Sequence, residues 1–299
     1  MVVTIQEFFE ETVSGDTESN RYLETIQVKQ FWKEGYKGGN VVVAVIDTGC
    51  DINHPSLGGK IIDGYNFTDD SQGDIHNYQD FNGHGTHVTG VIVGEDTGVA
   101  PEAKVLTLKI LNKYGNGKIE DLIKAIRYAL DWNGPSNEKV RIICLSLGGK
   151  ENRKELHEVI KEAVNNKVSV VVASGNDGDG TNKVQIDYPG YYNEVIQVGA
   201  LYDEGHIATF SNHNNEIDLV APGSRVYSTY LNGQYKKMSG TSMAAPFVAG
   251  SLALIIQAIE GKFQRSLSET EVYAQLIKRT KAVTSNYLVE GNGQIKLFL

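Results

Sequence analysis

The chain has 299 residues, 40% of them hydrophobic, which is enough apolar material for the core of one large α/β domain or of two small ones. Its 28 basic and 37 acidic residues give a formal net charge of −9. An acidic surface repels phosphate backbones and anionic lipids, so the charge argues against nucleic acid or a membrane as the partner.

Short β-branched runs alternate along the chain with longer segments of helical period. Near-continuous apolar runs are typical of parallel strands covered on both faces. In chain order, the predicted strands are residues 41–47, 105–110, 141–146, 168–173, 195–200 and 217–221. The predicted helices are an apolar segment at 88–93 that begins near His84, and residues 119–132, 155–164, 243–259 and 268–283. This alternation predicts βαβ units and a three-layer αβα domain around a central, mostly parallel sheet.

The sequence predicts a cytoplasmic location. Its first residues are acidic and soon polar, without the basic start and apolar run of a secretory signal. The most apolar window, residues 243–256, is interrupted by Pro246, so we interpret it as a buried helix rather than a membrane span. The two cysteines, Cys50 and Cys144, cannot form a disulfide framework, and we expect both to be reduced and mostly buried.

Asp47 ends the first predicted strand and is followed by Thr48 and Gly49, so its carboxylate emerges at the carboxyl end of the sheet, where active residues gather in such folds. An aspartate in this place is more often a structural cap. Asp-Thr-Gly is also the signature of aspartic proteases, and a second copy begins at Asp96, so two carboxylates sharing a proton are an alternative. The alternating helices argue against the two-lobed all-β fold of that class.

His84 lies between two glycines in the motif Asn82-Gly83-His84-Gly85-Thr86-His87, at the start of a predicted helix. The flanking glycines let backbone and substrate approach the imidazole closely. A lone histidine is more often structural, and a pair formed with His87 near Asp80 would suggest zinc. The third ligand and the glutamate of a His-Glu-x-x-His arrangement are absent from the sequence, which argues against a metal site here.

Ser242 stands in the motif Ser239-Gly240-Thr241-Ser242-Met243-Ala244-Ala245-Pro246, at the start of a strongly apolar helix. A serine in this place also suits a helix cap. However, a helix start offers aligned N–H groups and positive dipole to a developing oxyanion. A nucleophilic serine needs a nearby base, and the base needs an orienting carboxylate. A further polar motif, Ala173-Ser174-Gly175-Asn176, closes another predicted strand.

The motifs around Asp47, His84, Asn176 and Ser242, in the order Asp, His, Ser, resemble the subtilisin (subtilase) family of serine proteases from about residue 26 onward. Asp-Thr-Gly-Cys, Asn-Glu-Val-Ile and the tail Ser-Leu-Ser-Glu-Thr-Glu-Val-Tyr-Ala-Gln-Leu-Ile are most similar to the bacterial intracellular subtilisins. The resemblance implies that Ser242 attacks the scissile carbonyl and that His84 takes its proton. It also implies that Asp47 orients the imidazole and that the side-chain amide of Asn176 donates to the oxyanion.

The resemblance further implies that substrate binds in extended form between two strand edges. Main-chain hydrogen bonds let one groove accept many sequences. One edge carries Gly115 and Gly117, and the other carries Ser146, Leu147 and Gly148.

Asp187 matches a position at the base of the family's primary specificity pocket, where small residues are usual. A buried carboxylate needs a partner, and a lysine or arginine of the substrate would supply it. Asp177 would add negative potential at the pocket rim. We therefore expect a preference for a basic P1 residue, the residue on the acyl side of the cut bond. The alternative is that Asp187 turns outward to solvent.

The implied chemistry needs no cofactor, but two departures from the family bear on its calcium sites. The loop before Val99-Ala100-Pro101, which usually supplies carbonyl ligands to a tightly held calcium, is shortened to residues 91–98, and Ser56 stands where an aspartate usually helps it. We predict no high-affinity calcium there. Glu216 and Asp218 resemble a weaker family site for calcium or sodium, and ordinary solvated carboxylates are an equal alternative.

We expect residues 25–299 to form the peptidase domain and residues 1–24 to be a short N-terminal extension. Intracellular members of the family carry a short extension with a Leu-Ile-Pro-Tyr-like plug, a motif that this sequence lacks. Residues 4–22 would either lie across the substrate groove or be disordered, so a regulatory role stays open.

The leading prediction is a serine endopeptidase that degrades unfolded or damaged proteins inside the cell. A dedicated cytoplasmic protease that removes leader sequences from peptides is the second, and Asp187 and the missing plug favour it. A third, of another class, is an inactive subtilase fold used as a binding protein, although all four chemical positions are filled. We expect protein or peptide substrates as partners, without nucleic acid or membrane, and a homo-oligomer stays open.

Overall fold

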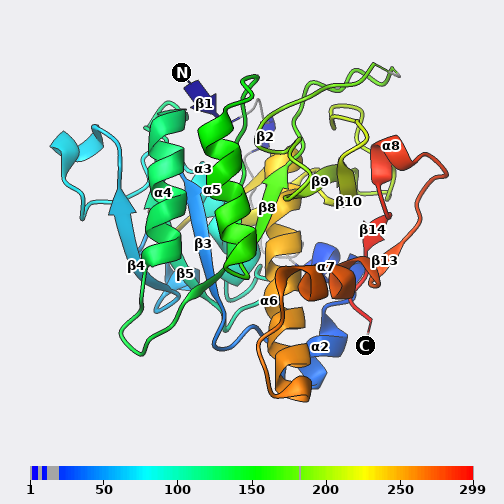
Figure 1. Ribbon diagram of the computed structural model, residues 1–299, viewed down its shortest axis with the longest axis horizontal. Coiled ribbons are helices and arrows are strands. Elements are labelled where there is room, and N and C mark those ends of the chain that lie inside the picture. The colour runs from blue at the N-terminus through cyan, green and yellow to red at the C-terminus, as the bar shows by residue number, and fades with distance from the viewer. Residues whose placement is uncertain (1, 6–8, 12–19, 182, 299) are drawn as a thin grey trace.

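A parallel β-sheet runs through the centre of the protein (Figure 1). The computed structural model describes residues 2–5, 9–11, 20–181 and 183–298. The strands of the central sheet are β3 (Val42–Asp47), β4 (Ile61–Asn66), β5 (Lys104–Lys109), β7 (Val140–Leu145), β8 (Ser169–Ala173), β9 (Ile196–Leu201), β10 (Ile217–Pro222), β13 (Thr280–Lys281) and β14 (Gln294–Ile295). Their spatial order is β13-β14-β10-β9-β8-β7-β3-β5-β4. Among the described residues of this central sheet, only β13 and β14 pair antiparallel.

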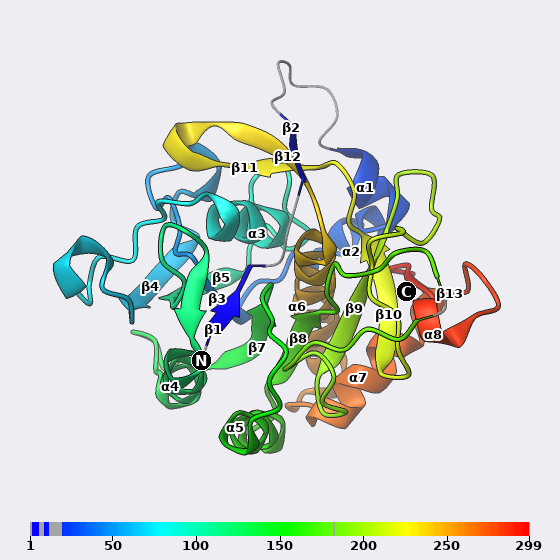
Figure 2. The same ribbon diagram turned by 90° about the horizontal axis from the view of Figure 1, so that it is seen from above.

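Helices cover both faces of this sheet. They are α1 (Asn20–Thr25), α2 (Lys29–Lys33), α3 (His84–Val93), α4 (Ile119–Asp131), α5 (Lys154–Asn165), α6 (Thr241–Phe263), α7 (Glu269–Ile277) and α8 (Tyr287–Glu290). Figure 2 shows α4 and α5 on one side of the sheet and α3 and α6 on the other. Along β3 the side chains alternate between the two cores, with Val43 and Val45 on the α3–α6 side and Ala44 and Ile46 on the α4–α5 side. The three-layer fold that the sequence predicts is confirmed.

The long helix α6 lies at the centre of one of the two cores. Its length and composition would allow it to cross a membrane, but 94% of its most apolar window is buried inside the protein. The interpretation of this segment as a core helix is therefore confirmed. Pro246 is the sixth residue of α6 and cannot donate to the carbonyl of Ser242, which accepts from the Ser146 hydroxyl at 2.8 Å instead.

All six predicted strands are present, and the structure corrects two other features. The last predicted helix ends at Ile277 rather than at residue 283, because Thr280 and Lys281 leave the helix to pair with β14. Its capping box is present, with Ser268 and Glu271 each accepting from the other's backbone N–H. Strand β4 was not predicted, since its sequence IIDGYN contains a glycine and two polar residues and lacks a clear apolar pattern.

Two small sheets involve the N-terminal segment. β1 (Val2–Thr4) pairs with β6 (Asn116–Lys118), and β2 (Phe9–Glu11) adds to β12 (Tyr235–Ser239), which pairs with β11 (Val226–Thr229). Helix α1 buries Tyr22 and Leu23 in the core, so the expected boundary between residues 24 and 25 falls inside this helix. Of the segment expected at the groove, residues 6–8 and 12–19 lie outside the described residues.

His87 ties α3 to the sheet formed by β11 and β12. It is fully buried, and its Nε2 donates to the carbonyl oxygens of Val226 (2.9 Å) and Lys236 (3.1 Å). Burial lowers its pKa to about 3. An unfolded histidine has a pKa of about 6.5 and takes up a proton first as the pH falls. The stabilisation by neutral His87 is therefore complete above pH 6.5 and is lost progressively toward pH 3.

We expect the substitution His87→Gln to reduce the acid sensitivity of folding. Between pH 7 and pH 5 the buried imidazole accounts for a loss of about 2 kcal/mol of unfolding free energy, which glutamine cannot show because it does not titrate. Denaturant unfolding at both pH values measures this loss. His76→Gln, at an exposed histidine, is the matched control and should keep the wild-type pH dependence. Equal pH slopes for wild type and His87→Gln would contradict the assignment.

Candidate active site

The predicted site motifs come together at the carboxyl edge of the central sheet. Asp47 ends β3, which lies between β5 and β7 where the strand order changes direction, and such switch points form crevices for ligands. Ser146 follows β7, and Asn176 follows β8. His84 begins α3 and Ser242 lies in the first turn of α6, and these two helices pack against each other.

Asp47 and His84 form a buried hydrogen bond of 2.8 Å between Oδ1 and Nδ1. The side chains are 1% and 0% exposed, respectively. The backbone N–H of Thr48 donates to the same carboxylate oxygen at 2.7 Å, which fixes the carboxylate in turn. The bond to Nδ1 selects the tautomer in which Nε2 carries the lone pair that a general base needs.

Two glycines let the start of α3 approach the Asp47 turn. Gly49 has φ of +106°, and a Cβ there would lie 2.4 Å from the carbonyl oxygen of Tyr78. A Cβ on Gly85 would lie 2.2 Å from the Gly49 carbonyl and 3.1 Å from Asp47 Oδ1. A larger residue at position 85 would therefore separate the start of α3 from the Asp47 turn, and one at position 49 would displace the backbone of Tyr78.

Asp80 positions the loop that leads into α3. Its Oδ1 accepts from Thr48 Oγ1 (2.9 Å), Asn82 N (2.8 Å) and Gly83 N (2.9 Å), while Oδ2 accepts from Thr86 N (2.9 Å) and Thr86 Oγ1 (2.7 Å). Burial raises its pKa despite these donors. This role of Asp80 was not predicted from the sequence, although its place two and three residues before two loop N–H groups is typical of a capping aspartate.

Ser242 and Ser146 bind each other. The Ser242 hydroxyl donates to the Ser146 carbonyl at 3.1 Å, and the Ser146 hydroxyl donates to the Ser242 carbonyl at 2.8 Å. The single proton of Ser242 thus points at a carbonyl in the free protein. A transfer of this proton to the imidazole of His84 would require the hydroxyl to turn toward that ring, and contacts of this kind commonly tighten only when substrate binds.

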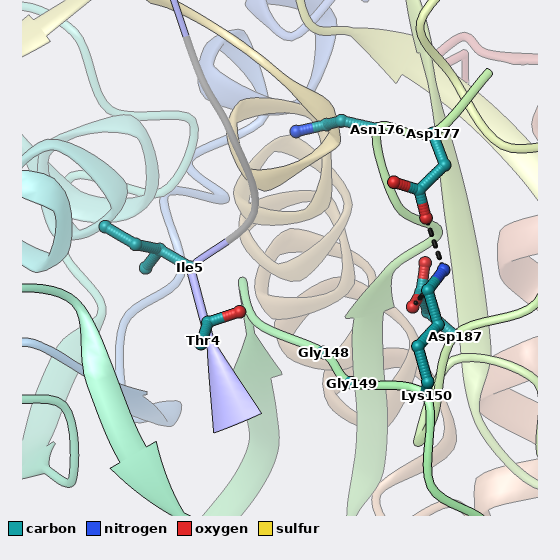
Figure 3. Close-up of a pocket in the computed structure, with 8 residues that line it drawn as sticks. All are labelled: Thr4, Ile5, Gly148, Gly149, Lys150, Asn176, Asp177 and Asp187. Atoms are coloured by element: carbon teal, nitrogen blue, oxygen red, sulfur yellow. Dashed lines mark hydrogen bonds and ion pairs between the residues drawn. The ribbon is translucent and has the colours of Figure 1, made fainter. Parts of the chain in front are cut away.

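The side chain of Asn176 is held by the residue that precedes the serine. Its Oδ1 accepts from the N–H and the hydroxyl of Thr241, both at 2.9 Å. With the oxygen fixed in this way, the amide nitrogen points away from Asp177 and toward the groove (Figure 3). An amide donor beside Ser242 suits the stabilisation of an oxyanion.

The chain's own N-terminal segment occupies the predicted substrate edges. Thr4 exchanges two backbone hydrogen bonds with Gly148, both of 3.1 Å, and the N–H of Ile5 donates to the Gly115 carbonyl at 3.0 Å. The segment therefore runs between the two edges as an added strand, as a bound peptide would.

Val3 anchors this segment. It lies opposite Gly117 in the antiparallel register of β1 and β6. Its side chain is 1% exposed and belongs to the same apolar cluster as Leu147, whereas the neighbouring Val2 is 59% exposed. The predicted edge residues thus surround a strand in the structure.

Asp187 does not turn outward to solvent, so that alternative was wrong. Its side chain is 3% exposed, with Oδ2 accepting from Asn212 Nδ2 at 2.7 Å and Oδ1 paired with Lys150 Nζ at 2.8 Å. Burial raises its pKa in spite of these two donors. The contact with Lys150 was not predicted, although the place of this lysine directly after Gly148 and Gly149 puts it next to the groove.

The two carboxylates of the expected weak cation site are engaged elsewhere. Asp218 Oδ1 accepts from the Tyr273 hydroxyl at 2.6 Å and Oδ2 from the Gln197 N–H at 2.7 Å, and burial raises the Asp218 pKa to about 6. Glu216 Oε1 accepts from Asn215 Nδ2 at 2.6 Å. Within the described residues, no group of three or more His, Cys, Asp or Glu side chains is arranged to hold a metal ion.

The family model and the relatives that this chain matches all point to one family of proteases. The sequence model of the subtilase family matches residues 38–294. The intracellular serine protease of Paenibacillus polymyxa is 49% identical over 283 residues, covering 93% of this chain and 85% of that protein. The major intracellular serine protease of Bacillus subtilis (strain 168) is 48% identical, with coverage of 92% and 86%. Subtilisin DY of Bacillus licheniformis is 38% identical, with coverage of 77% and 82%.

We expect Asn176→Leu to lower kcat for peptide hydrolysis by about 10²–10³ with little change in KM, a magnitude established for the equivalent donor of subtilisin itself. The reason is that the amide would bind the oxyanion of the transition state and not the ground-state carbonyl. Steady-state kinetics on one peptide substrate measures both constants. Asn133→Leu, at an exposed asparagine, is the control. A fall of less than about tenfold, or a fall that appears only in KM, would contradict the role.

Proposed function

Because the chain belongs to the subtilase family and is a serine endopeptidase, we propose that Ser242, His84 and Asp47 act as its catalytic triad, with Asn176 as the oxyanion donor. The observation that carries the proposal is the buried Asp47–His84 bond of 2.8 Å. The neighbouring helix start brings Ser242 next to the anchored amide of Asn176. These are the base, orienting carboxylate, nucleophile and oxyanion donor that acyl transfer requires.

The reaction proceeds in two displacements. Ser242 Oγ bonds to the scissile carbonyl carbon while its proton passes to His84 Nε2, and the resulting oxyanion accepts from the Asn176 amide. The C–N bond then breaks, and the leaving amine takes the proton from His84. Water attacks the acyl-enzyme in the same way, with His84 as base, and releases the carboxylic acid and free Ser242. Asp47 stabilises the imidazolium that forms in each half.

Substrates are proposed to be proteins inside the cell. Two of the relatives are named intracellular serine proteases. Backbone pairing at Gly115 and Gly148 would hold any extended chain, whatever its side chains, and this favours general turnover of unfolded proteins. We therefore place the enzyme in the cytoplasm, acting broadly on flexible polypeptides.

The N-terminal segment is proposed to compete with substrate. Because β1 uses the Gly115 and Gly148 groups that an extended substrate would use, both cannot bind at once. The buried Val3 side chain supports a defined rather than a random contact. The extension would thus restrain the protease until it is displaced or removed.

The primary specificity pocket is proposed to accept basic P1 residues. Asp187 is a buried carboxylate fixed by Asn212, and Asp177 stands at the rim. Two carboxylates face one lysine, so the pocket keeps a net negative charge. Electrostatic attraction to a P1 lysine or arginine follows from this charge.

The site for tightly bound calcium is proposed to be lost. In the shortened loop, the Gly90 carbonyl accepts from the Thr97 hydroxyl at 2.8 Å, and the Gly94 carbonyl accepts from Gly98 N at 2.8 Å. Ser56 Oγ accepts from the N–H of Glu95 at 2.8 Å. The loop therefore closes on itself through hydrogen bonds, without need of a cation to collect its carbonyls.

A fluorophosphonate probe tests the proposed nucleophile. We expect the wild-type protein to be labelled and to digest casein, and Ser242→Ala to do neither, because only an activated serine reacts with this electrophile. Ser251→Ala, a buried serine of the same helix whose hydroxyl bonds to the Phe247 carbonyl, is the matched control and should still be labelled. Labelling of Ser242→Ala, or no labelling even when the substitution Val3→Asp releases β1 from the groove, would sink the proposal.

The substitution Val3→Asp tests the N-terminal restraint. Placing a charge in the buried pocket of Val3 should release β1 and raise kcat/KM for a peptide at least about tenfold, given the free energy of burying a valine. The matched variant is Val2→Asp, at the exposed neighbour, which should change kcat/KM little. If both variants behave alike, or if Val3→Asp has no effect, β1 does not restrain the enzyme.

A further inference from the structure

Lys150 stands at the mouth of the specificity pocket. The pocket has a volume of about 330 Å³ and is lined by Thr4, Ile5, Gly148, Gly149, Lys150, Asn176, Asp177 and Asp187. Figure 3 shows the Lys150 side chain extending to the two aspartates on one wall, with Thr4 and Ile5 of the N-terminal segment across the opening. The ammonium of Lys150 thus already faces Asp177 and Asp187, the two carboxylates that we propose attract a basic P1 residue.

The ammonium of Lys150 binds both aspartates at once. Nζ lies 2.8 Å from Asp187 Oδ1 and also donates to Asp177 Oδ2, with a longer contact of 3.4 Å to the Ile186 carbonyl. Burial lowers the lysine pKa, but the hydrogen bonds to Asp177 and Asp187 outweigh it and raise the pKa. Lys150 is therefore a charged ammonium shared by two carboxylates.

A backbone bridge brings this lysine to the pocket. Gly149 and Tyr188 exchange two hydrogen bonds, of 2.9 and 2.7 Å. Each bridge residue has a charged neighbour in sequence, since Lys150 follows Gly149 and Asp187 precedes Tyr188. The pairing of lysine and aspartate thus follows from the strand edge itself and not from a chance surface contact.

The two partners differ in mobility. Asp187 is 3% exposed and is fixed from behind by Asn212, whereas the Lys150 side chain is 64% exposed. An exposed lysine gains little from an ion pair and has many rotamers available outside it. Moving the ammonium away from Asp187 is therefore easy, while moving Asp187 is not.

We propose that Lys150 is a specificity-determining residue. Its ammonium pairs with Asp187 when no basic P1 residue is bound, and a basic P1 side chain displaces it from Asp187. This inference rests on the protease function and the pocket assigned above. When a P1 lysine or arginine enters, Lys150 keeps its bond to Asp177 and the substrate takes Asp187, so each carboxylate has one cation. When an apolar P1 enters, Lys150 stays and neutralises Asp187.

Lys150 accordingly broadens the range of P1 residues that the pocket accepts. Without it, an uncharged P1 side chain would have to enter beside a buried carboxylate with no cationic partner, which is unfavourable. With it, the pocket accepts apolar side chains, and a basic side chain has to displace an internal competitor. The lysine raises the rate for one class of substrate and lowers it for the other.

The test uses peptide anilides that are identical except at P1, which is Arg, Lys, Leu or Phe. We expect Lys150→Gln to raise the Arg-to-Leu ratio of kcat/KM about tenfold or more. In this variant a P1 arginine gains a buried charge-assisted hydrogen bond to Asp187, whereas a P1 leucine enters beside an unpaired carboxylate. The Lys-to-Phe ratio should move the same way. Any competition from the N-terminal segment is the same for each substrate and cancels in the ratio.

Two variants make the result specific. Lys154→Gln removes an equal charge from a lysine that is 86% exposed and pairs with Glu158, and it should leave the ratio within about twofold of wild type. In an Asp187→Asn background, Lys150→Gln should change the ratio far less than it does in wild type, because the shared partner is gone.

The outcomes separate this inference from the protease function. A ratio that stays within about twofold in Lys150→Gln, or that changes equally with and without Asp187, overturns the role of Lys150 while hydrolysis itself continues. Absence of hydrolysis of every peptide even by the Val3→Asp protein, in which β1 is released from the groove, overturns the protease function and this inference with it. Because Lys150 is exposed, the variants are expected to fold, which thermal unfolding verifies.

Discussion

The buried hydrogen bond between Asp47 and His84 is the interaction on which the rest of the site depends. A carboxylate and an imidazole that are both withdrawn from water must face each other closely, because a positive charge on the imidazole, as the proposed mechanism requires, would otherwise be unstable. Gly49 and Gly85 permit that approach, and Asp80 fixes the loop between them. Three residues further along α3, His87 ties the same helix to β11 and β12. The geometry of one bond therefore constrains an entire helix.

The roles that we propose for two aspartates at the groove differ because the partners of these aspartates differ in mobility. The partner of Asp47 is a buried ring that cannot leave, which suits chemistry that needs a fixed geometry. The partner of Asp187 is the end of an exposed side chain that can leave, which suits a pocket that must receive different residues. Asp47 ends a strand of the central sheet, whereas Asp187 lies in the loop between β8 and β9, next to the bridge between Gly149 and Tyr188.

Most of the fold and of the candidate site could be predicted from the strongly apolar strands and from the order of the motifs. The strands that end at Asp47 and Asn176 were recognisable because burial on both faces leaves a continuous apolar run. The proposed role of Lys150 could not be recognised in the sequence. The direction of this exposed side chain depends on the bridge between Gly149 and Tyr188, which are far apart in sequence. Strand β1 is three residues long and has no pattern of its own, and its pairing with β6 arises only in the folded chain.

A crystal structure with a substrate-like peptide aldehyde tests the central claim most directly. The account predicts a covalent hemiacetal between Ser242 Oγ and the aldehyde carbon, with its oxygen about 2.7–3.1 Å from the Asn176 amide and His84 Nε2 directed at the new bond. The peptide should lie between Gly115 and Gly148, in the place of β1. Attachment to another residue, or a hemiacetal oxygen turned away from Asn176 and His84, would contradict the account.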